Sequence, residues 1–108
     1  MASFNKDVAC PITATIEYIG GRWKCIILFY LTAGTRRFGE IAARIPAISR
    51  KVLTQQLKEL ESDGLIMRKQ YNEVPPRVEY TLTDLGKSLS PVFKAMSAWG
   101  KTHVLNKQ

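Results

Sequence analysis

The sequence is poor in the residues that build metal and thiol sites. It holds two cysteines, Cys10 and Cys25, and a single histidine, His103. Two cysteines so far apart do not match the ligand spacing of a zinc site, and a structural disulfide would be unusual in a reducing compartment. There is also no CxxC motif, no pair of carboxylates and no glycine-rich phosphate loop. We therefore expect no metal, no cofactor and no enzymatic activity, with His103 on the surface.

Long apolar runs are missing as well. No stretch is long enough to cross a bilayer, and the opening residues MASFNKDVACP lack the basic start and apolar core of a signal peptide. The expected location is therefore cytoplasmic, with no membrane partner. The 108 residues suffice for one core and show no linker or internal repeat, which predicts a single domain over residues 1–108.

Acidic residues are scarce relative to basic ones. Sixteen Lys and Arg stand against nine Asp and Glu, which gives a net charge of +7 and a sequence pI near 9.7. Such a balance is typical of proteins that bind nucleic acid or another acidic surface. Charge alone does not distinguish double-stranded DNA from an acidic protein.

Residues 48–65 carry the signals of one complete helix. Ser49 suits the N-cap, where its hydroxyl accepts a hydrogen bond from an amide of the first turn, and Ile48 and Leu53 occupy the positions of a hydrophobic staple. Gly64 can adopt the left-handed conformation that ends a helix in a Schellman motif. The sequence therefore predicts a short helix with locally defined ends.

This helix is predicted to have two different faces. Leu53, Leu57 and Leu60 recur at the spacing of a buried stripe. The opposite face and its edges carry Arg50, Lys51, Thr54, Gln55, Lys58 and Ser62. Such side chains can donate to phosphates and to base edges in the major groove, but the same pattern is typical of a solvated helix face. The neighbouring segments have to decide between these interpretations.

Two helices are expected in the first third of the chain. Residues 10–19 repeat isoleucine at helical spacing behind Pro11, and the pair Gly20-Gly21 stops them. Residues 23–31 are apolar nearly all round, which predicts a central helix.

A third helix completes a helix-turn-helix pattern. Residues 38–45 have helical spacing over about two turns, and Pro46 closes them. The turn into the helix with the basic face is short, as in a helix-turn-helix. Arg36 and Arg37 are placed in the connection before this third helix.

The next segment predicts a β-hairpin. Residues 65–71 form one strand, residues 72–76 contain two prolines that stop it, and residues 77–82 alternate apolar and polar side chains. The basic side chains of the hairpin are Arg68, Lys69 and Arg77. On an edge strand such charges protect against aggregation. Directly after a helix with a basic face, they equally suit a wing that grips DNA.

A last amphipathic helix follows Thr83, which suits its N-cap. Its apolar seam consists of Leu85, Leu89, Val92, Met96 and Trp99. Pro91 should bend or divide this helix. The seam either packs onto its own domain or needs a partner. Residues 101–108 are expected to fray.

In this order the elements describe a winged helix-turn-helix, mainly α with a small β-hairpin. The chain resembles, from Cys10 to about Gly100, the HxlR family of bacterial and archaeal transcriptional regulators, relatives of the MarR group. The matching pieces are Cys10-Pro11, Gly20-Gly21-Arg22-Trp23, Arg37-Phe38, Ile48-Ser49, Leu53-Thr54 with Leu57, Leu60-Glu61-Ser62-Asp63-Gly64-Leu65, Pro75-Pro76-Arg77-Val78-Glu79-Tyr80, Leu82-Thr83 with Gly86, and Trp99. Each piece alone is weak, but their order and spacing together are specific. The family more often has Lys where Arg22 stands.

The resemblance implies a homodimer, formed through the N- and C-terminal helices, that sets two recognition helices on a pseudo-palindromic operator. The residues that would meet DNA are Arg37, Ser49, Arg50, Lys51, Thr54, Gln55, Lys58 and, in the wing, Arg77. The dimer interface would contain Ile12, Ile16, Leu89, Val92, Met96 and Trp99. Half-site centres should then lie one helical turn, about 34 Å, or a multiple of it apart.

Cys10 allows two alternatives. Several members of this family sense oxidants, quinones or other electrophiles through a cysteine at this position before the proline. At a helix N-terminus the dipole stabilises a thiolate, with Lys6 helping and Asp7 opposing. The other alternative is a small residue packed at the dimer interface. Cys25, inside the most apolar helix, is expected to be an inert core residue with a raised pKa.

The leading hypothesis is a sequence-specific DNA-binding transcriptional regulator that acts as a homodimer. Its switch would be thiol modification of Cys10, and its effector an oxidant or a small molecule. The alternative is a winged-helix protein-interaction module without sequence-specific DNA binding, whose basic face meets an acidic partner. Titrations distinguish the two, because phosphate contacts give a steep salt dependence and only operator recognition gives a large preference for one duplex.

Overall fold

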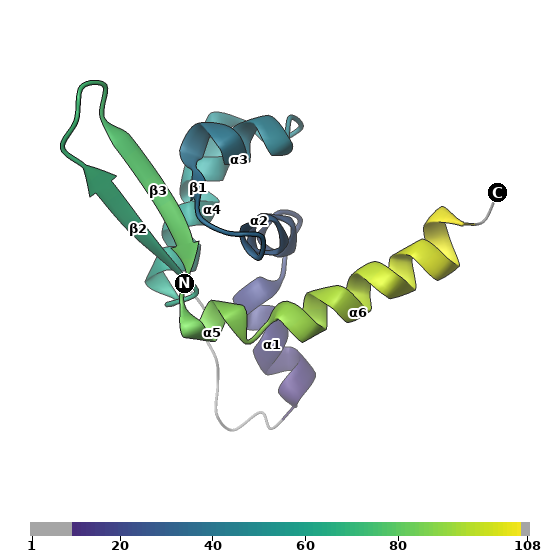
Figure 1. Ribbon diagram of the computed structural model, residues 1–108. Coiled ribbons are helices and arrows are strands. Elements are labelled where there is room, and N and C mark those ends of the chain that lie inside the picture. The colour runs from purple at the N-terminus through teal and green to yellow at the C-terminus, as the bar shows by residue number, and fades with distance from the viewer. Residues whose placement is uncertain (1–9, 107–108) are drawn as a thin grey trace.

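The computed structural model describes residues 10–106, which form a body of helices and a small antiparallel sheet (Figure 1). In chain order the elements are α1 (Pro11–Ile19), α2 (Lys24–Leu31), β1 (Arg36–Arg37), α3 (Phe38–Arg44), α4 (Arg50–Ser62), β2 (Ile66–Tyr71), β3 (Arg77–Leu82), α5 (Asp84–Lys87), α6 (Ser90–Gly100) and the π-helical turn η1 (Lys101–Leu105). The signal-peptide argument concerned residues 1–11, and most of these lie outside the described residues.

One hydrophobic core joins α2, α3, α4 and the sheet. The leucine stripe of α4 belongs to its most deeply buried part, since Leu53, Leu57 and Leu60 are at most 1% exposed. The buried side chains that complete this part of the core are Ile27, Leu28, Leu31, Ile41, Leu65, Ile66, Tyr80 and Leu82. The predicted stripe is therefore confirmed, and its burial turns the polar face of α4 towards solvent.

Both predicted ends of α4 are confirmed. The Val52 amide donates a hydrogen bond of 3.1 Å to Ser49 Oγ, which makes Ser49 the N-cap. At the other end Gly64 has a φ of +77°, and the Leu65 amide donates to the Leu60 carbonyl at 3.0 Å. This is the long bond of a Schellman motif, so both ends of α4 are held by local contacts.

The hairpin belongs to a three-stranded sheet with the strand order β1-β3-β2. Strands β2 and β3 pair antiparallel along their length, as predicted. The expectation that Arg36 and Arg37 lie in a plain connection is wrong, because they form β1 and pair with Tyr80 and Glu79 of β3. A strand this short has no alternating pattern to detect. It forms because the outer edge of β3 offers backbone groups that need partners.

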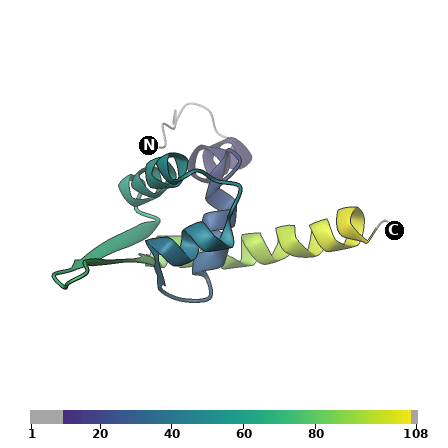
Figure 2. The ribbon, with the colours of Figure 1, turned by 90° about the horizontal axis from the view of Figure 1, so that it is seen from above.

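The arrangement is a winged helix-turn-helix. Helices α3 and α4 form the helix-turn-helix, and the β2–β3 hairpin forms the wing beside them. Figures 1 and 2 show the wing and α6 extending away from the helical body in opposite directions. The predicted fold class, mainly α with a small β element, is confirmed.

The last predicted helix is divided in two, in agreement with the effect expected of Pro91. Thr83 caps only the short α5, where its hydroxyl accepts a hydrogen bond from the Gly86 amide. Helix α6 begins at Ser90 and holds Pro91 in its first turn. Proline is tolerated there because the first amides of a helix have no partner within it.

The expectation that the chain frays after residue 100 is wrong for Lys101–Leu105, which continue α6 as a π-helical turn. Within this turn the ring centroid of His103 lies 5.0 Å from that of Trp99. His103 is exposed, as predicted. Residues 107 and 108 lie outside the described range.

Helix α2 is less central than its composition suggested. Its residues Ile27, Leu28 and Leu31 are buried, but Ile26 and Phe29 are 46% and 48% exposed. The predicted central position therefore holds for the buried residues, whereas the side chains of Ile26 and Phe29 are about half exposed. Helix α6 contacts α2 and then extends away from the body (Figures 1 and 2), and among the described residues Ile26 and Phe29 stay partly uncovered.

Candidate nucleic-acid interface

The outward face of α4 presents mainly polar side chains, although Val52 is also 38% exposed. The predicted contact residues Ser49, Arg50, Lys51, Thr54, Gln55 and Lys58 are all exposed. The hydroxyl of Ser49 uses an oxygen lone pair for the cap, which leaves its proton free to donate. Thr54 donates its own proton to the Arg50 carbonyl at 2.8 Å and keeps its acceptor lone pairs. This face can therefore offer both donors and acceptors to a duplex.

A cleft of about 410 Å³ separates α4 from the wing. We call it the wing cleft, and its lining consists of Phe38, Thr54, Leu57, Lys58, Glu61, Arg68, Val78 and Tyr80. Lys58 enters from α4 and Arg68 enters from β2, so two cations from different elements share one groove. Such an arrangement suits a phosphate backbone lying between helix and wing. Arg68 was noticed in the sequence only as a basic hairpin residue.

A second cleft, of about 360 Å³, lies between the wing tip and the helix-turn-helix. We call it the tip cleft, and its lining consists of Arg37, Phe38, Gly39, Arg50, Glu73, Pro75, Pro76, Arg77 and Val78. Three of the predicted contact residues, Arg37, Arg50 and Arg77, thus meet around one hollow. The guanidinium of Arg50 lies 5.0 Å from the centre of the Phe38 ring, a cation–π contact that holds it at the cleft. Lys51 and Gln55 line neither cleft.

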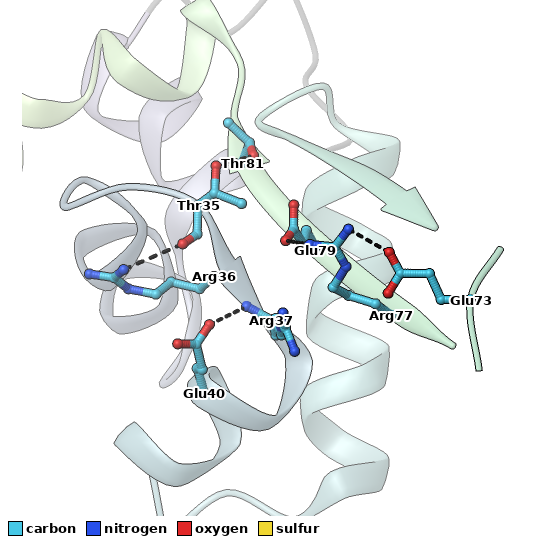
Figure 3. A network of polar contacts seen from close by, with 8 residues as sticks. All are labelled: Thr35, Arg36, Arg37, Glu40, Glu73, Arg77, Glu79 and Thr81. Carbon is cyan, nitrogen blue, oxygen red and sulfur yellow. Dashed lines mark hydrogen bonds and ion pairs between the residues drawn. The ribbon is translucent and has the colours of Figure 1, made fainter. Parts of the chain in front are cut away.

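Arg77 is engaged within the wing itself (Figure 3). Its guanidinium contacts Glu73 at 2.8 Å and Glu79 at 3.0 Å, and it lies 3.7 Å from the centre of the Tyr71 ring. Two carboxylates around one guanidinium leave no surplus positive charge at this point. A DNA contact by Arg77 stays a prediction, while the observed contacts brace the wing tip against its own strands.

Arg37 is placed at the junction of wing and helix-turn-helix. Its backbone amide donates to Glu40 at 2.8 Å, which fixes the start of α3 (Figure 3). Its pairing with Glu79 through β1 ties the same residue to the wing. The guanidinium is exposed and forms no ion pair with another described residue. Arg37 can therefore direct its charge towards a phosphate.

A polar chain that the sequence did not reveal connects α2 to the outward face of α4. Lys24, which is 9% exposed, contacts Glu59 at 2.8 Å, and Gln55 Nε2 donates to the other oxygen of Glu59 at 3.0 Å. The pKa of Glu59 lies below its usual range, chiefly because Lys24 donates to the carboxylate and next because Gln55 does. Lys24 stands far from Glu59 in sequence, so no local pattern signals this ion pair.

The two thiols have opposite environments. Cys10 is exposed at the N-cap of α1, and its pKa is lowered, first by the Thr13 side chain and then by the amides of Thr13 and Ile12. Burial raises the pKa of Cys25, whose sulfur donates to the Ile19 carbonyl at 3.3 Å. These directions favour the sensing alternative for Cys10 and agree with the raised pKa expected of Cys25. Lys6 and Asp7, invoked near Cys10, lie outside the described residues.

An apolar surface remains uncovered on α1 and α6. Of the predicted interface residues, Ile12, Ile16, Val92, Met96 and Trp99 are exposed, with Trp99 62% exposed, whereas Leu89 is half-buried against the core. Phe93, not the predicted seam, is the buried anchor of α6. The alternative that the whole seam packs onto its own domain is therefore wrong for four of its residues, Leu85, Val92, Met96 and Trp99.

The described residues hold neither a metal cluster nor a membrane span. Between residues 10 and 106, no three His, Cys, Asp or Glu side chains gather where they could bind a metal ion. No helix in this range is long and apolar enough to cross a bilayer.

Comparison with known proteins places these features in a family. The HxlR-like helix-turn-helix family matches residues 18–108. The HTH-type transcriptional regulator YtcD of Bacillus subtilis is 50% identical over 100 residues, which cover 93% of this chain and 79% of that protein. An HTH-type transcriptional regulator of Methanothermobacter thermautotrophicus is 50% identical over 99 residues, covering 92% and 76%. The solved structure of the redox regulator HypR in its oxidized form has a TM-score of 0.83 at 42% identity, covering 87% of this chain and 97% of that one.

Proposed function

The chain belongs to the HxlR-like helix-turn-helix family, and we propose that it binds a pseudo-palindromic operator in double-stranded DNA as a homodimer. It is a transcriptional regulator of this family and not an enzyme. The proposal further takes residues 1–108 to act as a single DNA-binding domain, in the cytoplasm where its DNA partner lies. Each protomer would insert α4 into one major groove.

The arrangement of cations around α4 and the wing is the observation that carries this proposal. Lys58 and Arg68 share the wing cleft, and Arg37 and Arg50 share the tip cleft, so four cations flank the exposed face of one helix. Phosphate contacts at both clefts would set the register of the protein on the duplex. The remaining exposed side chains of α4, Gln55 among them, would then face base edges.

We further propose that Cys10 is a thiol switch for an oxidant or another electrophile. Its exposure makes the thiol accessible, and its lowered pKa increases the fraction of reactive thiolate. Structures of the related redox regulator HypR are known in oxidized and reduced forms. In this chain α1 also carries Ile12 and Ile16, so modification of Cys10 would act on the dimer and change the spacing between two copies of α4.

Titration of the protein against the DNA upstream of its own gene tests the proposal. The duplex and a scrambled duplex of equal length are compared at two salt concentrations, with and without a thiol oxidant. An operator binder prefers its own duplex by a large factor, and the oxidant changes that affinity in the native protein but not in Cys10→Ser. If both duplexes bound equally and with a steep salt dependence, the protein would instead be a module that binds acidic surfaces without recognising a DNA sequence.

A further inference from the structure

The contact between Gln55 and Glu59 restricts how Gln55 can present its amide group. Both carboxylate oxygens of Glu59 are occupied, one by the Lys24 ammonium at 2.8 Å and the other by Gln55 Nε2 at 3.0 Å. An ionised carboxylate only accepts hydrogen bonds, so the Gln55 nitrogen has to face it and the carbonyl Oε1 points elsewhere. The lowered pKa of Glu59 keeps this acceptor ionised at neutral pH.

Lys24 holds the carboxylate from the core side. It is 9% exposed and comes from the first turn of α2, whose neighbouring side chains belong to the hydrophobic core. A buried ammonium needs a charged partner, and Glu59 is that partner. The pair adds no net charge to the surface of α4, so the carboxylate can lie next to a DNA-facing residue without repelling phosphates.

Gln55 lies among the residues proposed to face DNA. At 100° per residue it falls opposite the buried leucine stripe, between Lys51 one turn before it and Lys58 one turn after it. Gln55 lines neither of the clefts between α4 and the wing. Its side chain is therefore on the part of α4 that would enter the DNA major groove. Glu59 stands one turn further along the same side.

The remaining hydrogen-bonding groups of Gln55 match one base better than the others. With one N–H given to Glu59, Gln55 keeps one N–H donor and one C=O acceptor. The major-groove edge of adenine offers an acceptor at N7 and a donor at N6, whereas guanine offers two acceptors. An unrestrained glutamine can turn both of its N–H groups towards guanine. The restrained one makes two bonds to adenine and one to guanine, thymine or cytosine.

We propose that Glu59, held by Lys24, is a positioning residue that makes Gln55 select adenine at one position of each half-site. This inference rests on the proposed operator-binding function. Neither Glu59 nor Lys24 touches the base in this proposal. They act through the orientation of the Gln55 amide.

Selection from a pool of duplexes with a randomised centre tests the inference. The native protein defines its site, and dissociation constants are then measured on that site and on all single-base substitutions of it. Gln55→Ala should lose the adenine preference at one symmetric pair of positions. A bidentate contact corresponds to a preference of roughly 5-fold to 150-fold, so the loss is measurable.

Glu59→Gln is the decisive variant, because a neutral amide can donate as well as accept and no longer dictates which way Gln55 turns. The ratio of adenine to guanine affinity at that position should fall to within about 3-fold of unity, while affinity for the adenine duplex changes little. Glu61→Gln removes the same charge from the same helix without contacting Gln55. Because Glu61 lines the wing cleft, this variant should change affinity alike on all duplexes and keep the native ratio. Lys24→Arg preserves the ion pair and should also keep it.

The thermal unfolding of each variant distinguishes a change in the orientation of the Gln55 amide from a loss of protein stability. A merely structural role of Glu59 would lower affinity on every duplex together with the melting temperature, and would leave the adenine to guanine ratio unchanged. A native ratio in Glu59→Gln would overturn the inference, as would an unaltered preference matrix in Gln55→Ala. If the native protein selected no sequence at all, the proposed function would fail and the inference with it, so the two failures are distinguishable.

Discussion

Individual cations should determine how strongly and how specifically the surface formed by α4 and the wing binds DNA. Lys58 lies on the wing cleft, where a phosphate would be its partner, and Arg77 is already held by two carboxylates of the wing. Residues with the same formal charge therefore differ in what they can contribute. A cation without an internal partner can release counterions when it binds a phosphate. Arg77, which is already paired, instead stabilises the conformation of the wing tip.

Replacement of Lys58 by alanine should weaken binding equally on operator and random duplexes. If Lys58 meets one phosphate, the slope of log K against log salt should fall in magnitude by about one, because one fewer counterion is released. Equilibrium titrations at several salt concentrations measure the slope. Lys94→Ala, which removes an exposed lysine from α6, serves as the matched control and should leave it unchanged. An unaltered slope in Lys58→Ala would remove Lys58 from the interface.

The Cys10 thiol should be alkylated faster than Cys25 at neutral pH, because its lowered pKa raises the thiolate fraction whereas burial raises the pKa of Cys25. The Thr13 side chain is the largest cause of the lowering, so Thr13→Val should move the pH profile of alkylation upwards. Mass spectrometry after short exposure to iodoacetamide across a pH series reads both rates. Thr15→Val, whose hydroxyl donates to the Pro11 carbonyl instead, should behave as the native protein.

At the scale of elements, α4 is specified by its ends as much as by its leucine stripe. Its N-cap and its Schellman motif are made by residues adjacent to it in sequence. The wing differs, because β3 pairs with β1, which lies far away in the sequence. Local signals therefore position the recognition helix, and longer-range contacts position the wing against it.

The left-handed residue after α4 should be sensitive to a single added methyl group. Gly64 has a φ of +77° and no atom within 4 Å of a built Cβ, so Gly64→Ala should cost about 1–2 kcal/mol through backbone conformation alone. Denaturant unfolding measures the change. Gly39→Ala is the matched control, since Gly39 lies in α3 without positive φ and with equally open space, and it should stabilise by about 0.5–1 kcal/mol. A neutral Gly64→Ala would contradict the backbone argument.

At the scale of the whole molecule, the described residues of α1 and α6 carry large apolar side chains that remain exposed. Ile12 and Ile16 on α1 and Met96 and Trp99 on α6 are between 49% and 71% exposed. Large apolar side chains exposed in such number favour an interface. A homodimer that covers them would place two recognition helices on one duplex.

Replacement of Trp99 by lysine should therefore shift the protein from dimer to monomer, because it buries a charge in the proposed interface. Sedimentation velocity should show the change in mass, and operator affinity should fall by about 100-fold or more as the second half-site is lost. Val74→Lys places the same charge on a fully exposed apolar residue of the wing tip and should leave the mass of the dimer unchanged. A Trp99→Lys variant that stays dimeric would exclude Trp99 from the interface.

The sequence by itself determined the elements whose causes are local. Spacing placed the leucines of α4, Ser49 and Gly64 marked its ends, and Pro91 divided the last helix, because caps, turns and proline act over a few residues. Only the tertiary structure decided the contacts that join distant segments: β1 against β3, Lys24 with Glu59, and Arg68 beside Lys58 in the wing cleft. Such contacts depend on how packed elements meet, and no periodicity along the chain encodes them.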